Sequence, residues 1–224
     1  MTLEFRVLTS AAELAVMPEF EGLIWGGDDE RVSVNVLVAV VHEGGLALAA
    51  FDGDLVVATA FAFPTHEQGV LHSHYMAVHP EYRSRGVGEQ MKRAQAVWCR
   101  DHGYHAMRWT YDPMQLTNAH LNLNKLSALG VEYHPDLYGP LGGINGSLPS
   151  DRLTVQWELV APRPAFAETF QLSVPLVTPE QIAASAPEAH AARMAIREQM
   201  EPHLRDGWVV AGVDRHARTY TLAR

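Results

Sequence analysis

The segment Arg83-Ser84-Arg85-Gly86-Val87-Gly88 combines the residue types that bind phosphate groups in proteins. Glycines at a helix start let the backbone approach a ligand closely, and the first helical turn carries N–H groups without intrahelical acceptors. These donors and the helix dipole attract an anion, and Arg83 and Arg85 add cationic charge. Two familiar phosphate loops do not fit, because no Gly-Lys-Ser/Thr is present and Met91 stands where a dinucleotide loop has its third glycine. The segment therefore predicts a phosphate-binding turn of another kind.

Histidines shortly before this turn are candidate proton carriers. His72 and His74 lie two residues apart in a predicted strand, so their side chains share one face. A histidine of near-neutral pKa suits a general base, although with 12 histidines in the chain each has a packing role as its alternative. Strand alternation turns His79 away from the other two, and no carboxylate has supporting spacing, so no metal site is expected.

Hydrophobic periodicity predicts the elements that position these residues. Strands are expected at 4–8, 46–51, 55–63, 70–78, 105–111, 131–138 and 153–159, and the turn Asp52-Gly53-Asp54 predicts that 46–51 and 55–63 form a hairpin. Ser10-Ala11-Ala12-Glu13 predicts a capping box that opens a helix toward about residue 26, and further helices are expected at 86–102 and 117–129. Residues 26–29 form a break, residues 32–41 fit either a strand or a buried helix, and residues 139–151 form a loop. The stripe Val87, Met91, Ala94 and Trp98 marks the expected buried face of the helix 86–102. This order predicts a mixed α/β architecture.

Pro162 and Pro164 mark a boundary, so the expected organisation is a domain at 1–160 followed by a C-terminal extension at 161–224. Within the extension, helices are expected to begin near 178 and 185, the second ending near Met200 because Pro202 follows. A hairpin is expected at 208–213 and 218–222. A segment of 64 residues can form only a small core, so the extension is expected to pack on the body or on a second subunit of a homodimer.

Composition narrows the class of protein. Of 224 residues, 47% are hydrophobic and 19% are charged, which is ordinary for a globular chain, and no apolar run approaches the roughly 20 residues of a membrane span. The start of the chain lacks a secretory pattern, and the single cysteine, Cys99, fits a reducing cytoplasm. Acidic residues outnumber basic ones in residues 1–160, which argues against general nucleic-acid binding.

The turn and the strand end before it resemble a known enzyme signature. Ala77-Val78-His79-Pro80-Glu81 is followed by Arg83-x-x-Gly86-x-Gly88, a spacing similar to that of the GNAT superfamily of acyl-coenzyme A (acyl-CoA) dependent transferases. The resemblance covers about residues 3–160. It implies the GNAT fold, an α/β fold with a mixed α+β sheet, which the C-terminal helices and hairpin extend. It also implies acetyl-CoA or another acyl-CoA as co-substrate and no metal.

The resemblance assigns the co-substrate to particular groups. A splayed strand pair would hold the pantetheine arm, the turn amides would bind the pyrophosphate, and an asparagine early in the next helix would contact the cofactor. The residues concerned are Met76, Ala77, Val78, Arg83, Ser84, Arg85, Gly86, Val87, Gly88 and Asn118.

The family pattern also suggests catalytic roles. In several members a glutamate six residues before the motif valine is the base, and His72 occupies that position, with His74 as the alternative. The usual general acid is a tyrosine in the helix after the fifth strand, where this chain has Leu126. Tyr138, in the next predicted strand, is the candidate substitute, and its alternative role is packing.

Two further residues are candidates for binding substrate. Asn122 lies one turn after Asn118 on the predicted helix and could orient substrate or face solvent. Arg152 could receive a carboxylate or lie at an exposed strand edge. The segment Trp109-Thr110-Tyr111-Asp112-Pro113 and the C-terminal extension resemble a less-studied branch of the superfamily, and some members of this branch are tied to N-acylation, including N-succinylation, of amino acids.

The expected function is transfer of an acetyl or other short acyl group, such as succinyl, to the amine of a small acceptor, for example an amino acid. The amine would attack directly in a ternary complex. Two alternatives stay open at the level of sequence. One is an acyl-CoA-binding sensor without catalysis, favoured by Leu126, and the other is a protein lysine acetyltransferase.

Overall fold

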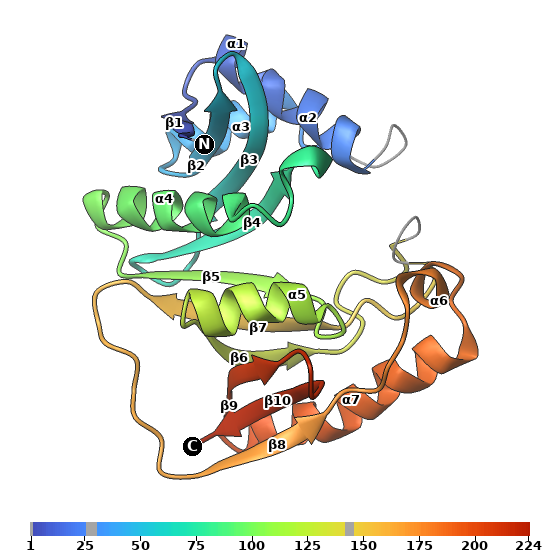
Figure 1. The fold of residues 1–224 in the computed structure, drawn as a ribbon. Coiled ribbons are helices and arrows are strands. Elements are labelled where there is room, and N and C mark those ends of the chain that lie inside the picture. The colour runs from blue at the N-terminus through green and yellow to red at the C-terminus, as the bar shows by residue number, and fades with distance from the viewer. Residues whose placement is uncertain (1, 26–30, 142–145) are drawn as a thin grey trace. The chain divides into compact units, whose positions relative to one another are not determined.

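The computed structural model describes residues 2–25, 31–141 and 146–224. The break expected at residues 26–29 and part of the loop expected at 139–151 lie outside the described residues. The chain forms two compact units, Met1–Arg108 and Trp109–Arg224, and each is described by itself (Figure 1). The predicted extension, residues 161–224, lies in the same unit as residues 109–160.

The first unit is built on antiparallel strands in chain order, as the sequence predicts. They are β1 (Glu4–Val7), β2 (Leu46–Asp52), β3 (Leu55–Pro64) and β4 (Val70–Val78). The start of β5 (Ala106–Tyr111) pairs with β4 in parallel. A turn with Gly53 in a left-handed conformation joins β2 to β3, which confirms the expected hairpin.

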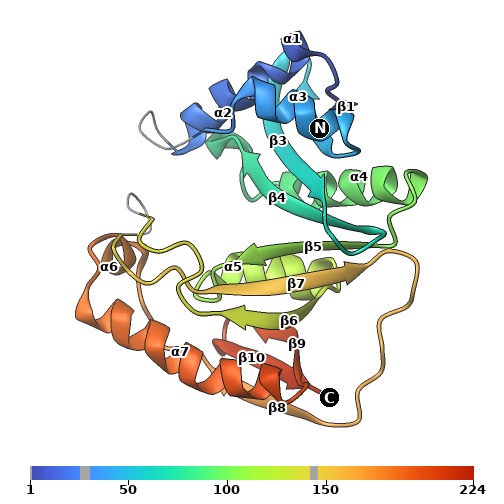
Figure 2. The ribbon, with the colours of Figure 1, turned by 180° about the vertical axis from the view of Figure 1, so that it is seen from behind.

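Helices cover both faces of these strands (Figures 1 and 2). They are α1 (Ala11–Leu14), α2 (Val16–Trp25), α3 (Val34–His42), the short 3₁₀ turn η1 (Pro80–Tyr82) and α4 (Val87–Asp101). The expected capping box is present, because the Ser10 hydroxyl accepts from the Glu13 amide at 3.3 Å and the Glu13 carboxylate accepts from the Ser10 amide at 2.9 Å. The single helix expected there is divided at Ala15 into α1 and α2. Residues 32–41 were open to two interpretations, and most of them form the helix α3.

The buried face of α4 differs from the predicted stripe. Val87 and Met91 are buried as expected, but Ala94 and Trp98 are only half-buried. The helix instead buries Lys92, Gln95, Ala96 and Cys99. Periodicity of apolar residues missed this face because two of its members are polar. On the other face of the strands, Leu14, Met17 and Leu37 pack with Ala47 and Phe61.

The second unit continues from β5 with the strand order β5-β7-β6-β9-β10-β8. These strands are β6 (Leu129–His134), β7 (Arg152–Glu158), β8 (Thr169–Ser173), β9 (Val209–Asp214) and β10 (Thr219–Ala223). The hairpin of β9 and β10 was expected, whereas β8 was missed. Tyr138 was expected in a strand but lies in a turn after β6, which ends at His134.

Helices in the second unit also depart from the prediction. They are α5 (Leu116–Ala119), the π-helix η2 (His120–Lys125), α6 (Pro179–Ala183) and α7 (Pro187–Arg205). The helix expected at 117–129 ends earlier, because Leu129 and Gly130 begin β6. α7 was expected to end near Met200, but it continues to Arg205 with Pro202 inside its last turns. Figures 1 and 2 show α5 and η2 on one face of the strands and α7 on the other.

The extension is joined to residues 109–160 by a strand pairing and by buried polar contacts. β9 pairs with β6 at Val210 and Gly130. Arg193 of α7 donates to both carboxylate oxygens of Asp112, at 2.7 and 2.9 Å. The buried hydroxyl of Tyr220 donates to the carbonyl of Pro113 at 2.7 Å. These contacts make the extension part of the core of the second unit.

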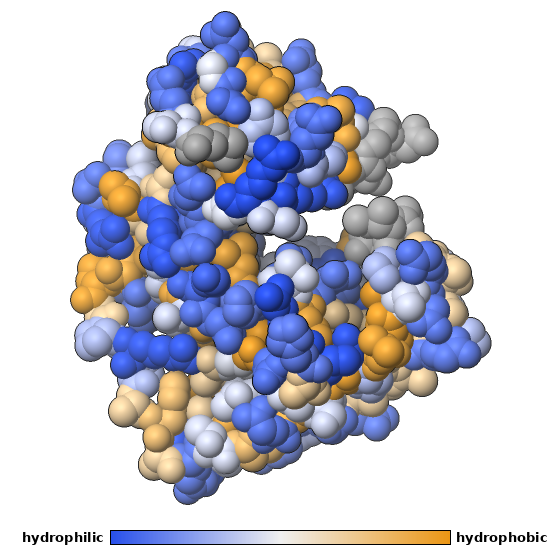
Figure 3. Space-filling view, in the orientation of Figure 1, coloured by the Kyte–Doolittle hydropathy of each residue, from blue (hydrophilic) through white to orange (hydrophobic). Residues whose placement is uncertain are grey.

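Hydrophilic residues predominate on the surface of each unit that Figure 3 shows, as expected for side chains in contact with water. Among the described residues, no helix is both long and apolar enough to cross a membrane. Cys99 is buried and unpaired, and burial raises its thiol pKa to about 12, so it packs as a small apolar residue.

Candidate functional site

The phosphate-binding turn predicted from the sequence connects β4 to α4 in the first unit. Its backbone is positioned by two left-handed residues, Ser84 with φ of 60° and Gly86 with φ of 80°, on either side of Arg85. Alternation of this kind turns neighbouring N–H groups toward one side and forms an anion-binding concavity. Arg83, Ser84, Arg85 and Gly86 are exposed, whereas Val87 is buried and anchors the start of α4.

The start of α4 leaves its amides available to a ligand. Gly86 is the N-cap residue and no side chain caps the helix. The first amides of an α-helix lack intrahelical acceptors, so those of Val87 and Gly88 can donate to an anion. A Cβ built on Gly86 would meet only the Gln90 Nε2 atom, at 4.0 Å. The space beside Gly86 is therefore open, which suits a pyrophosphate.

Arginines on either side of Ser84 differ in their contacts. The Nε of Arg83 donates to the carbonyl of Val78 at 3.2 Å, which ties the turn to the end of β4. The Arg85 guanidinium lies 5.5 Å from the ring centroid of Tyr82. The Tyr82 hydroxyl in turn donates to Asp52 at 2.9 Å. The turn is thus held by contacts on its strand side, while exposed cationic groups surround its amides.

A β-bulge changes the side-chain alternation of β4. Phe61 pairs with Tyr75 and Ala62 pairs with Ser73, so His74 is an extra residue. A bulge places two consecutive side chains on one face, and the ring contacts agree. His72, His74 and Tyr75 all lie against Phe61 or Phe63, with His72 stacked on Phe63 at 4.9 Å. The two histidine rings are 6.2 Å apart, as the shared face predicts.

The protonation of His72 differs from the sequence-based expectation. Burial lowers its pKa to about 4, and the positive charges of His74, Lys92 and Arg108 act in the same direction. His72 is therefore neutral at pH 7, with a lone pair available, but it is a weaker base than a histidine of near-neutral pKa. Burial also lowers the pKa of His74. Met76, Ala77 and Val78 follow, with Ala77 buried and paired to Thr59.

The opposite face of β4 holds a polar cluster that the sequence analysis missed. Ser73 lies between the two histidines, and its hydroxyl accepts from Lys92 Nζ at 2.8 Å and donates to Gln95 Oε1 at 3.2 Å. All three side chains are buried. Burial lowers the pKa of Lys92 to about 7. The signal in the sequence was the pair Lys92 and Gln95 between apolar positions of the helix.

In the second unit, the two predicted asparagines do not share a face. Asn118 is exposed on α5, whereas Asn122 is buried in η2, where its side chain accepts from Trp109 Nε1 at 3.2 Å. A π-helix has a wider turn than an α-helix, so a spacing of four residues no longer returns to the same face. Asn122 therefore holds Trp109 in the core, and the expected surface position is wrong.

Tyr138 and Arg152 are brought together. The Tyr138 hydroxyl is 3.3 Å from the Thr110 hydroxyl, and the Arg152 guanidinium lies 5.5 Å from the Tyr138 ring centroid. Tyr138 is exposed, while Arg152 is half-buried and burial lowers its pKa. Leu126 is a buried core residue. Among the described residues there is no cluster of three or more histidine, cysteine or acidic side chains that could hold a metal ion.

A family model matches part of the chain. The acetyltransferase (GNAT) family model matches residues 13–121, which include β4, the turn and α4. This segment, slightly less than half of the chain, is similar to the GNAT acetyltransferases. The similarity supports an N-acyltransferase that uses an acyl-CoA donor, and the open amides at the start of α4 fit the phosphates of such a donor. A comparison with curated protein sequences finds no match.

Solved structures share the fold at low sequence identity. The ribosomal-protein-S18-alanine N-acetyltransferase of Escherichia coli aligns with a TM-score of 0.58 and 12% identity, over 72% of this chain and 96% of that one. The Salmonella typhimurium protein yncA, solved with acetyl-CoA, gives 0.57 and 17% over 75% and 99%. A phosphinothricin acetyltransferase of Sinorhizobium meliloti, solved with acetyl-CoA, gives 0.55 and 17% over 74% and 94%.

Proposed function

We propose that this enzyme transfers an acetyl or another short acyl group, such as succinyl, to the amine of a small acceptor, for example an amino acid. The observation that carries the proposal is the open, uncapped start of α4, with Gly86 in a left-handed conformation, inside the segment that matches the family. The amides from Arg83 to Gly88 would bind the pyrophosphate, and the backbone from Met76 to Val78 would hold the pantetheine arm. Asn118, exposed on α5, would be a further contact.

Direct attack in a ternary complex requires two proton movements. The amine loses a proton as its nitrogen bonds to the acyl carbon, and the sulfur gains one as the carbon–sulfur bond breaks. His72 is the proposed proton acceptor, because it is neutral at pH 7 and half-buried on β4. His74 is the alternative acceptor on the same face. Tyr138 is the proposed donor to the sulfur, since Leu126 cannot supply a proton.

A small acceptor with a carboxylate is favoured by Arg152. Its guanidinium is half-buried beside Tyr138, where a carboxylate could form a charge-assisted pair. A protein acceptor would instead present a lysine side chain without a nearby carboxylate. Acceptors that carry a carboxylate are therefore the first to test.

The test measures thiol release and identifies the product. The protein is incubated with acetyl-CoA or succinyl-CoA and each of a panel of amino acids, their amides, and lysine-containing peptides. We expect CoA release above the rate without acceptor, and an N-acylated amino acid by mass spectrometry. Acylation of peptides but not of free amino acids would reject the small acceptor. Tight binding of acyl-CoA without turnover on any amine would reject the transfer reaction.

A further inference from the structure

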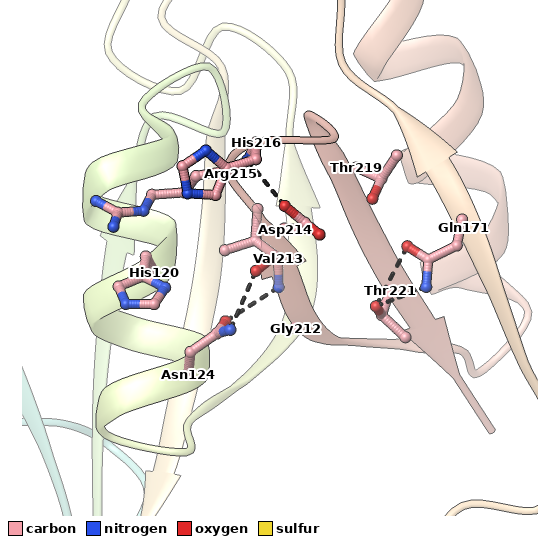
Figure 4. Close-up of a pocket in the computed structure, with 10 residues that line it drawn as sticks. All are labelled: His120, Asn124, Gln171, Gly212, Val213, Asp214, Arg215, His216, Thr219 and Thr221. Atoms are coloured by element: carbon pink, nitrogen blue, oxygen red, sulfur yellow. Dashed lines mark hydrogen bonds between the residues drawn. The ribbon is translucent and has the colours of Figure 1, made fainter.

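A polar pocket in the second unit belongs to none of the groups assigned above. Its volume is about 550 Å³, within the range of sites that bind small molecules. It opens between η2 and the hairpin of β9 and β10, with β8 at its far side (Figure 4). The lining residues are His120, Asn124, Gln171, Gly212, Val213, Asp214, Arg215, His216, Thr219 and Thr221.

Three irregularities of the backbone occur around this pocket. The residue Ala211 is a bulge in β9, because Thr221 pairs with Gly212 and Leu222 pairs with Val210. Gly212 lies within β9, and a Cβ atom added to it would lie 3.7 Å from the Thr221 side chain. A glycine at this position therefore leaves room in the pocket that a larger side chain would fill. The facing wall is the π-helix η2. Bulges, strand glycines and π-helices are each enriched where ligands bind.

Hydrogen bonds hold the two walls of the pocket in place without a ligand. The Asn124 side chain donates to the Val213 carbonyl and accepts from the Val213 amide, both at 3.0 Å. Arg163 donates to the carbonyl of the bulge residue Ala211, and to the Leu123 carbonyl of η2 at 3.4 Å. β9 and η2 are thus cross-linked at two points. A ligand would meet a preformed site and would lose little free energy in ordering it.

The charges of the pocket are separated. Asp214 accepts at Oδ1 from the amides of His216 at 2.8 Å and Ala217 at 2.9 Å, and these bonds lower the pKa of its carboxyl. In the part of the chain that is described, no hydrogen bond involves Asp214 Oδ2. Asp214 lies on the side of the hydroxyls of Thr219 and Thr221, whereas Arg215 lies on the side of η2 (Figure 4).

Groups on the η2 side are basic or neutral donors. Burial lowers the pKa of His120, and the charges of Arg215 and Lys125 act in the same direction, so His120 is neutral at pH 7 while both cations lie near it. His216 completes this side. The pocket therefore offers a carboxylate and hydroxyls on one side, and a guanidinium with imidazoles on the other.

We propose that this pocket binds a small zwitterion, a free α-amino acid, with its ammonium group toward Asp214 and its carboxylate toward Arg215 and His120. An ammonium and a carboxylate a few bonds apart match both signs of charge at once. A phosphate or nucleotide would face the ionised Asp214, and an apolar ligand would leave the polar lining unpaired. The proposal does not depend on the acyl transfer reaction, because binding requires no acyl-CoA.

Calorimetric titration of the full-length protein with free amino acids tests the proposal. The probes are the common L-amino acids, each compared with its N-acetyl derivative, which lacks the ammonium, and with its amide, which lacks the carboxylate. We expect at least one amino acid to bind, and both of its derivatives to bind about tenfold more weakly or not at all. Equal binding of either derivative, or no binding by any amino acid, would overturn the proposal.

Variants locate the site. Asp214→Asn keeps the Oδ1 acceptor for the turn amides but removes the charge, and Gly212→Leu fills the space beside Thr221, so each should weaken binding about tenfold or more. Gly212→Ala is the matched control for the backbone, because its Cβ makes ordinary contacts with Thr221. Asp206→Asn, exposed after α7, is the control for charge. Unchanged affinity in both Asp214→Asn and Gly212→Leu, with thermal melting intact, would place the ligand elsewhere and reject the pocket.

Discussion

At the scale of single residues, the position of Gly86 imposes two requirements that only glycine meets together. Its φ of 80° is left-handed, and the space beside it is open for a ligand. Gly86→Ala should cost about 1–2 kcal/mol of stability from the backbone alone. It should also weaken acetyl-CoA binding about tenfold or more, because the new methyl group would enter the space proposed for the phosphates. Calorimetry with acetyl-CoA and urea unfolding measure the two effects.

Gly53→Ala is the matched control for this substitution. Gly53 has a φ of 61° in the turn between β2 and β3, and its surroundings are open. The same backbone penalty is therefore expected there without any effect on acetyl-CoA. Equal losses of acetyl-CoA affinity in the two variants would remove the turn from the binding site.

His72 carries the second prediction at this scale. Its pKa in the folded protein, about 4, lies below the ordinary value of 6.5. Above about pH 6.5 this histidine is neutral in both the folded and the unfolded chain. As pH falls toward about 4 the unfolded chain binds a proton that the folded chain does not, so the free energy of unfolding decreases. His72→Gln should flatten the decline of the unfolding free energy across this range, measured by urea titration at several pH values.

The same substitution should affect the reaction if His72 accepts the proton. We expect the turnover number kcat to fall about 100-fold with the acetyl-CoA affinity unchanged. The wild-type rate should show no acidic limb from this histidine between pH 6 and 8, because His72 is already neutral there. Full activity in His72→Gln would transfer the role to His74 or to solvent, and His74→Gln is the comparison variant.

At the scale of elements, α4 has two roles that impose opposite requirements. Its start leaves amides uncapped, which would bind the phosphates of the proposed donor, whereas its middle buries the ammonium group of Lys92 against Ser73. Burial lowers the Lys92 pKa from 10.5 to about 7. Between these two values the unfolded chain binds more protons than the folded one, so stability should rise with pH by up to about 1.4 kcal/mol per unit. Lys92→Met should abolish this rise and leave stability at pH 7 equal or higher.

Urea unfolding at pH 7 and pH 9 measures this effect. Lys125→Met is the control, since Lys125 is exposed on η2. A wild-type protein whose stability does not rise with pH more than that of Lys92→Met would show that the buried ammonium is fully compensated. Acetyl-CoA affinity serves as the check that α4 keeps its position.

The same helix shows what local sequence can and cannot predict. The hairpin of β2 and β3, the capping box at Ser10 and the turn at Gly86 depend on neighbours in the chain, and all three were predicted. The buried position of Lys92 depends on Ser73, which is 19 residues away. The helix expected at 117–129 ends before Leu129 and Gly130, which pair with Gln156 and Val155 of β7, and this pairing between distant segments could not be predicted from periodicity.

Among the candidate site residues, too, positions set by neighbours in the chain were predicted and positions set by distant segments were not. His72 and His74 were placed on one face by alternation, and the bulge that adds Tyr75 to that face was not predictable from the strand alone. Tyr138 and Arg152 come together through a turn that the sequence suggested to be a strand. The pocket at Gly212 combines η2, β8 and the terminal hairpin, which are far apart in the sequence.

At the scale of the whole molecule, the C-terminal extension completes the second unit. Strand β9 pairs with the edge of β6, and α7 provides the arginine partners of two acidic side chains. The Asp151 side chain is fully buried, and it accepts from Arg197 Nε at 2.9 Å and from the Tyr133 hydroxyl at 2.7 Å. A homodimer, which the sequence allowed as the place for the extension, stays a prediction that sedimentation can test.

A chain ending at Val160 is therefore expected to be insoluble or unfolded in its second half. Removing α7 strips Arg193 from Asp112 and Arg197 from Asp151, and an unpaired buried charge costs about 3–5 kcal/mol each time. Two such losses approach the whole stability of a typical domain, about 5–15 kcal/mol. In the full-length protein, Arg193→Met should cost about 3–5 kcal/mol, whereas Arg205→Met, at an exposed ion pair of the same helix, should cost less than about 1 kcal/mol. Solubility, circular dichroism and urea titration measure these effects, and a soluble, active chain 1–160 that unfolds cooperatively would contradict the integral role of the extension.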